Sequence, residues 1–190
     1  MDYLNSAEGR KLFRETEQLA YMQELKDKNC PGSIASWEMQ TMSFYHEPHE
    51  LSKVINSQYN IKNFNDLPEI PDDKAPIVAI AGTITNTDNN KHLISLLTTK
   101  GVVDVKIFKG AYAKYNQKIS AIDKATNKKI VIDDSWFKRG NKIIVYGCRR
   151  ENTFTARNDY SSGYPRLVGL IEAVKTSGDL DIRYSRRTKL

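Results

Sequence analysis

The stretch that decides the fold is Ile77-Val78-Ala79-Ile80-Ala81-Gly82-Thr83-Ile84-Thr85. A run of β-branched and small apolar residues of this kind is typical of a buried strand. Gly82 lies within the run, and a glycine inside a strand favours the sharp bend or bulge that the corner of a small barrel requires. The stretch therefore predicts the first strand of a β-barrel, followed by a polar turn at residues 85–90.

The segments that follow predict four more strands and one helix. In chain order these are two strands, a helix and two strands, at residues 92–98, 102–108, 110–119, 141–148 and 153–157. Three strands, a helix and two strands is the order of an OB-fold barrel. Residues 168–174 add a last apolar element, either a strand or a helix.

Before residue 77 the apolar spacing is helical. Residues 7–28 carry apolar side chains three and four positions apart, and shorter helices are expected at 33–44 and from His49 onward. Prolines at 68, 71 and 76 disfavour a regular element in the segment before the barrel. The predicted fold class is α+β, organised as a helical segment, a linker, a five-stranded OB-fold domain and a mobile basic tail, at residues 1–62, 63–76, 77–175 and 176–190.

The composition of the 190 residues, 39% hydrophobic and 27% charged, is that of an ordinary folded domain. No apolar run approaches the ~18 residues that cross a bilayer. The first residues lack the basic region and apolar stretch of a secretory signal. Cys30 and Cys148 lie far apart and away from other metal ligands, so we expect free thiols in a reducing cytoplasm.

Charge is distributed unevenly between the two halves of the chain. Residues 1–90 contain 8 Lys+Arg and 14 Asp+Glu, a net charge of −6, whereas residues 91–190 contain 21 and 9, a net charge of +12. This asymmetry indicates a polyanionic partner for the second half. A basic surface without a partner has the same composition, so charge alone leaves both interpretations open.

Two stretches resemble a known family. The first, residues 37–51, contains an acidic start, Ser43-Phe44-Tyr45, and then His49 and Leu51. The second begins with the strand at residue 77 and continues through Val105-Lys106-Ile107-Phe108, Tyr112-Ala113-Lys114-Tyr115, Ser135-Trp136-Phe137 and Val145-Tyr146-Gly147-Cys148-Arg149-Arg150. Together they resemble the C-terminal region of the bacterial replicative DNA polymerase III alpha subunit, with Ser43 and Glu50 in place of the family's usual Gly and Pro.

The resemblance covers roughly residues 33 to 175. It implies an OB domain that acts in DNA replication. The family's polymerase palm with its metal-binding aspartates, its N-terminal phosphatase-like domain and a clamp-binding peptide are not found in this sequence. The chain is thus expected to be a C-terminal piece, which is a separate gene, a split subunit, a phage relative or a truncated reading frame, with no catalytic centre of its own.

The residues themselves predict no catalytic group, cofactor or metal site. Pro48 separates His46 from His49 and interrupts the helix that a zinc-binding pair would need. Asp133-Asp134 is an adjacent carboxylate pair, which marks a turn or a helix cap more often than a site for two metal ions.

The candidate nucleic-acid-binding residues lie on the two loops that flank an OB groove and on the strands between them. They are Lys91, Lys106, Arg149, Arg150, Phe154 and Arg157. Lysine and arginine neutralise phosphates, and an exposed aromatic ring stacks on bases. Phe154 has an equally supported alternative, which is to fill the barrel.

We expect a module that binds single-stranded nucleic acid, DNA rather than RNA, together with other replisome subunits or a polymerase core. The alternative is a protein-interaction module that docks onto a separately encoded polymerase core. That alternative predicts an exposed apolar patch at Phe44, Tyr45 and Leu51. An OB fold by itself does not decide between them.

Overall fold

A computed structural model describes residues 14, 16–21, 24, 38, 49–54, 56–69, 76–122 and 127–188. The chain divides into two compact units, Met1–Glu47 and Pro48–Leu190. The described residues of the first unit are helical. Within the described ranges no helix is long and apolar enough to cross a lipid bilayer.

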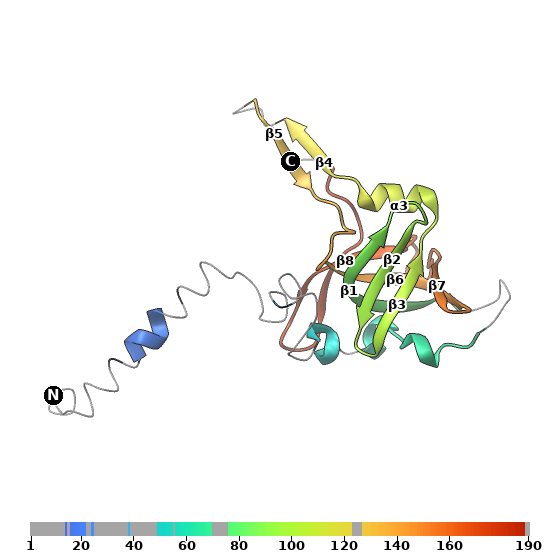
Figure 1. Cartoon of the computed structure of the whole chain (residues 1–190), viewed down its shortest axis with the longest axis horizontal. Coiled ribbons are helices and arrows are strands. Elements are labelled where there is room, and N and C mark those ends of the chain that lie inside the picture. Colours follow the sequence, from blue (N-terminus) through green and yellow to red (C-terminus); the bar gives the residue numbers. More distant parts are fainter. Residues whose placement is uncertain are drawn as a thin grey trace. The chain divides into compact units, whose positions relative to one another are not determined.

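The second unit is built around a closed five-stranded barrel (Figure 1). Its strands are β1 (Val78–Asp88), β2 (Leu93–Thr98), β3 (Gly101–Lys106), β6 (Lys142–Arg150) and β7 (Thr153–Ala156). They pair in the order β1-β2-β3-β7-β6, and β6 pairs back with β1 to close the barrel. All pairs are antiparallel except β3 with β7. The structure therefore confirms the predicted OB-like α+β fold.

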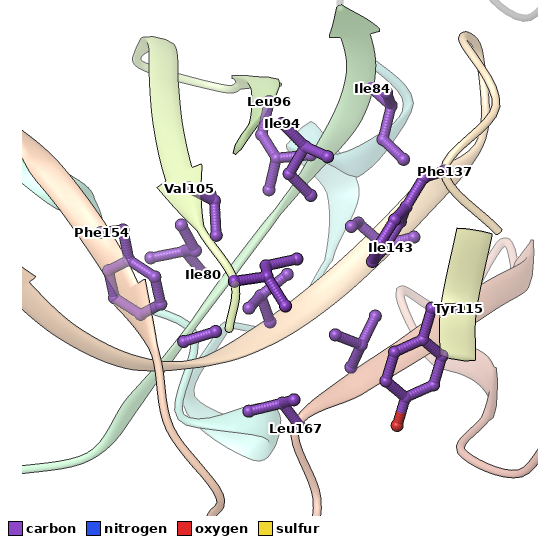
Figure 2. Packing of buried hydrophobic residues seen from close by; sticks show 14 of the residues in the cluster. Ile80, Ile84, Ile94, Leu96, Val105, Tyr115, Phe137, Ile143, Phe154 and Leu167 are labelled. Carbon is purple, nitrogen blue, oxygen red and sulfur yellow. The ribbon is translucent and has the colours of Figure 1, made fainter. Parts of the chain in front are cut away.

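The barrel core comes from alternate residues of the strands, as the pleat requires. Ile80 and Ile84 on β1 meet Leu96 on β2, Val105 on β3 and Phe154 on β7 (Figure 2). Gly82 lies where β1 passes close to β2, because a Cβ there would stand 2.7 Å from the Leu97 carbonyl oxygen. Strand β1 carries a bulge, but it lies between Ile84 and Asn86 and not at Gly82, which pairs in regular register with Ile143.

A second apolar layer covers the outer face of β1 and β6. Ala79, Ala81 and Ile144 point away from the barrel interior and pack with Leu51 and Tyr146. The residues that cover this outer face belong to β8 (Val168–Val174), β9 (Leu180–Arg183) and the 3-10 helices η2 (Glu50–Lys53) and η3 (Asn56–Tyr59). A strand that is buried on both faces reads as a continuous apolar run, which explains the decisive stretch of sequence.

The connection from β3 to β6 holds a helix and a hairpin. Helix α3 (Lys109–Asn116) is the predicted helix, and it ends earlier than expected. Strands β4 (Ile119–Ile122) and β5 (Lys129–Asp133) pair with each other as a separate two-stranded sheet. This hairpin, which extends away from the barrel (Figure 1), was not predicted.

Three parts of the predicted organisation differ from the structure. Residues 60–62, at the end of the expected helical segment, belong with the barrel, because the Lys62 N–H donates to the Ala79 carbonyl at 2.8 Å and Ile61 bridges to β1. Part of the expected linker forms the 3-10 helix η4 (Phe64–Asp66). The expected mobile tail at 176–190 instead contains β9 and the buried Arg186.

Candidate nucleic-acid interface

The outer face of β2, β3 and β7 is the part of the barrel where OB folds bind oligonucleotides. Alternation along each strand turns Ser95, Asp104, Lys106, Thr153 and Thr155 to this face. Cross-strand register arranges them in two rows. One row runs through Arg150, Thr153, Asp104 and Ser95, and the next through Thr155, Lys106 and Leu93.

Two of the predicted basic residues therefore share one face. Arg150 and Lys106 are both exposed and lie in neighbouring rows, on strands separated by β7. Adjacent strands are about 4.8 Å apart, so the two side chains flank a strip that one sugar–phosphate backbone can follow. This arrangement requires the tertiary fold, because the two residues are far apart in sequence.

The loop between β1 and β2 carries Lys91, whose side chain is 78% exposed and lies 3.9 Å from the Asp88 carboxylate. Asp88 Oδ1 accepts hydrogen bonds from the backbone N–H groups of Asn90 and Lys91. The hydroxyl of Tyr112 on α3 donates to Asn89 Oδ1 at 2.8 Å. The loop is thus held in one shape by its own turn and by the helix, and it presents Lys91 to solvent.

Phe108 is an exposed aromatic residue beside this loop that was not among the predicted site residues. It follows β3 directly, forms the N-cap of α3 and is 55% exposed. The preceding residue, Ile107, donates its backbone N–H to the His92 carbonyl at 3.0 Å, which fixes the β3 end against the loop. The alternation of the strand would have revealed its exposure, because Phe108 continues the outward-facing positions Asp104 and Lys106 and follows the buried Ile107.

Arg149 does not share the outer face with Arg150. Its guanidinium lies 4.7 Å from the Phe64 ring centroid, donates to the Leu67 carbonyl and stands 3.7 Å from the Glu69 carboxylate. It also donates from Nε to the Glu151 carbonyl within its own loop. Arg149 therefore holds residues 64–69 against the end of the barrel, and its side chain is only 20% exposed.

Phe154 exposes no ring face on which a base could stack. It is fully buried in the barrel interior opposite Val105, so it fills the core (Figure 2). Arg157, the first residue after β7, is half-buried and bonded through its N–H to the Tyr146 carbonyl. Of the six predicted residues, Lys91, Lys106 and Arg150 are the exposed ones.

The centre of the outer face is not basic. Asp104 lies in the row of Arg150, next to the row of Lys106, and accepts a hydrogen bond of 2.7 Å from the Ser95 hydroxyl. A carboxylate here repels phosphate, so the phosphate contacts that this face can make lie at its flanks. The centre offers threonine hydroxyls and the edges of Leu93 and Leu97 instead.

The other polar groups singled out in the sequence have structural roles. The His49 ring accepts from the Leu51 N–H at 3.0 Å and contacts the Leu97 carbonyl at 2.9 Å, so its nitrogens serve a cap. Its partner in the sequence motif, His46, lies outside the described residues. Asp133 binds Arg183 and Arg186, and Asp134 pairs with Lys138. Leu51 is buried, and Phe44 and Tyr45 lie outside the described residues.

Two curated proteins match most of the chain. "Probable DNA polymerase YorL" of Bacillus subtilis (strain 168) is 36% identical over 172 residues, which cover 84% of this chain. A "DNA-directed DNA polymerase" of Bacillus phage SPbeta matches with the same identity and coverage. The chain is therefore homologous to part of a DNA polymerase.

The chain spans 13% of the length of each of these polymerases. No protein-family profile matches it, and no solved structure matches it significantly. Homology to a DNA polymerase is thus shown, whereas the closer resemblance to the alpha subunit of DNA polymerase III stays a prediction.

Proposed function

We propose that this chain is the single-stranded DNA-binding OB module of a replicative DNA polymerase of the bacterial and phage type, resembling DNA polymerase III alpha. It holds the unpaired strand on the outer face of β2, β3 and β7 and performs no chemistry itself. The catalytic steps belong to polymerase segments, or to replisome partners, outside this chain. One observation carries the proposal: an OB-like barrel, in a chain homologous to DNA polymerases, places exposed Lys106 and Arg150 on its outer face.

The basic residues at the flanks supply the affinity in this proposal. Each phosphate that a Lys or Arg neutralises releases counterions, so affinity falls by about 0.7 log unit per log unit of salt for each contact with a single strand. Lys91, Lys106 and Arg150 together therefore account for a slope of about −2. Phe108 contributes stacking, which releases no counterions and is insensitive to salt.

The test is fluorescence anisotropy of a labelled single-stranded oligonucleotide titrated with the full chain across a salt series. Lys106→Ala and Arg150→Ala should each reduce the slope by about 0.7, and the double variant by about 1.4. Lys175→Ala is the matched control, because it removes an exposed lysine next to β8, a strand that does not pair with β2, β3 or β7.

The control should leave the slope unchanged. If Lys175→Ala reduces the slope as much as Lys106→Ala, the binding is spread over the whole basic surface and the outer-face site is wrong. If the wild-type chain binds no single strand even at low salt, the proposal as a whole fails.

A second candidate function is docking onto a separately encoded polymerase core. The observation that favours it is the β4–β5 hairpin, where Ile122 and Val131 are 63% and 56% exposed. An isolated two-stranded hairpin is marginally stable in water, so apolar side chains on one favour a partner that covers them. Failure of single-strand binding in the salt series would place this candidate first.

A further inference from the structure

The connection between β7 and β8 exposes two tyrosines. Tyr160 is 64% and Tyr164 is 79% exposed, and Tyr164 has the largest exposed fraction among the large apolar side chains of the described residues. Large exposed aromatic rings are more informative than exposed small apolar ones, because burying an aromatic ring is worth more. The five residues from Tyr160 to Tyr164 form the tip of the connection.

Contacts between the two residues that flank the tip, Asp159 and Arg166, hold its base in place. Asp159 and Arg166 exchange two backbone hydrogen bonds of 2.8 Å, which makes a one-rung antiparallel bridge. Their side chains also pair, with Arg166 Nη2 at 2.5 Å from Asp159 Oδ2. Asp159 further accepts from the N–H and hydroxyl of Ser161, at 3.0 and 2.8 Å.

The turn itself is also defined. The Gly163 N–H donates to the Tyr160 carbonyl at 3.0 Å, and Gly163 adopts a φ of +81°, which favours glycine. The Ser162 hydroxyl donates to the Tyr164 carbonyl. The two rings are therefore carried on a backbone that is already ordered, so that binding to them costs little conformational entropy.

The base of the loop is anchored in the second apolar layer. The Arg166 guanidinium lies 4.9 Å from the Tyr146 ring centroid and 5.9 Å from that of Tyr184. The hydroxyls of Tyr146 and Tyr184 are 2.8 Å apart. The buried rings are used for packing, whereas Tyr160 and Tyr164 are left at the surface.

The loop continues directly from the proposed interface. Thr155 on β7 stands beside Lys106, and β7 ends at Ala156 before Arg157 bonds to β6. Strands β3 and β7 run parallel, so the loop leaves the barrel at the end of the sheet where β3 reaches Lys106 and Phe108. The loop that carries the two tyrosines therefore starts from the Lys106 end of the proposed interface.

We propose that Tyr160 and Tyr164 form a base-stacking site for the unpaired bases of the same strand, beyond the outer face of β2, β3 and β7. This inference rests on the proposed function. Flat aromatic rings on an ordered loop accept any base, because every base has a π-face. The site therefore adds affinity and length to the contact without adding sequence preference or phosphate neutralisation.

The experiment compares the wild-type chain with Tyr160→Ala/Tyr164→Ala and Tyr160→Phe/Tyr164→Phe by anisotropy. The oligonucleotide has about 16 nucleotides, the upper end of the length that one OB fold covers. The Ala variant should bind at least about fivefold more weakly at every salt concentration, with the salt slope unchanged, and the Phe variant should bind as the wild type does.

A second arm removes the bases instead of the rings. Oligonucleotides with abasic sites at the 5′ end or at the 3′ end keep their phosphates and lose their stacking surfaces. One of the two should weaken wild-type binding by the same factor as the Ala variant, and the Ala variant should be insensitive to that substitution. Such non-additivity identifies a direct contact between ring and base.

Ile122→Ala/Val131→Ala is the matched control, because it trims two comparably exposed apolar side chains on the β4–β5 hairpin. It should not change binding. The tyrosine site would be wrong if the Ala variant binds as tightly as the wild type, or if its loss of affinity adds to the loss caused by the abasic substitution. In either case the salt slopes of the Lys106 and Arg150 variants would still support the proposed function. Absence of wild-type binding overturns both.

Discussion

Asp133 and Arg186 form a buried ion pair that ties the end of the chain to the barrel. Arg186 Nε stands 2.6 Å from Asp133 Oδ2, and the two side chains are 3% and 4% exposed. Arg186 also donates to the carbonyls of Tyr115 at 2.7 Å and Gln117 at 2.7 Å, at the end of α3. One guanidinium thus donates hydrogen bonds to carbonyl groups at the C-terminal end of α3 and also pairs with a carboxylate. Asp133 is the only carboxylate that it contacts among the described residues.

Replacing Arg186 by Ala should destabilise the chain strongly. The change leaves the Asp133 carboxylate and several helix carbonyls buried with fewer donors, and breaking a buried pair in this way costs about 3–5 kcal/mol. Urea unfolding followed by circular dichroism measures the free energy of unfolding. Arg187→Ala is the control: this side chain is 59% exposed, pairs with Glu172, and its loss should cost less than about 1 kcal/mol. Equal effects of the two substitutions would show that the tail contributes only a diffuse positive charge.

His49 should make stability depend on pH. Burial lowers the pKa of His49 below its ordinary value of 6.5, and the charge of Lys142 acts in the same direction, against the Leu97 hydrogen bond and the charge of Glu50. The folded state therefore binds a proton less readily than the unfolded state does. Stability contributed by the neutral ring is complete above about pH 6.5 and is lost as pH falls through the lowered pKa.

The variant His49→Asn isolates this contribution. Asparagine is a good N-cap and does not titrate, so it can keep the hydrogen bond to the Leu51 N–H while removing the proton linkage. Chemical unfolding at about pH 7.5 and about pH 5.5 should show a smaller loss of stability for the variant than for the wild type. A loss of the same size in both would assign the pH dependence to other groups.

Asp104→Asn should strengthen single-strand binding. The carboxylate lies on the outer face in the row of Arg150, two residues before Lys106 on β3, where it repels phosphates, and asparagine keeps an acceptor for the Ser95 hydroxyl. The gain should be a few-fold at low salt and shrink as salt screens the charge, which anisotropy titrations at two salt concentrations measure. Unchanged affinity at low salt would remove this face from the interface.

Phe108 and Phe154 should respond oppositely to truncation. Phe154→Ala empties part of the barrel core and should cost about 3–5 kcal/mol of stability. Phe108→Ala alters an exposed ring, so it should keep the free energy of unfolding within about 0.5 kcal/mol. It should weaken binding at all salt concentrations without a change in slope. A large loss of stability in Phe108→Ala would mean that this ring packs rather than stacks.

Sequence periodicity predicted the strands because each barrel strand alternates between core and surface. The first strand was recognisable even without alternation, since burial of Ala79 and Ile80 on opposite faces demands an unbroken apolar run. The loops were placed well enough to put Lys91 and Arg150 at exposed positions. These features depend on neighbours along the chain, which a single sequence displays directly.

Near the ends of a strand, the alternation of apolar and polar residues did not decide which side chains point into the core. Arg149 and Arg150 are adjacent and chemically identical, yet one holds residues 64–69 and the other lies on the outer face. Phe154, for which stacking and filling the barrel were both open, fills the core, whereas the exposed aromatic ring is that of Phe108. A strand of period two fixes which residues share a face, but only the pairing partner determines which face is buried.

What the sequence by itself determined is the order of the five barrel strands and helix α3 and the basic character of the second half, because both follow from local pattern and composition. What only the tertiary structure decided is the use of each charged and aromatic side chain. Asp133 and Arg186, and Lys106 and Arg150, come together across long stretches of chain through the closure of the barrel and the pairing of β3, β7 and β6. No local periodicity encodes such contacts, since they depend on the path by which distant segments return to one another.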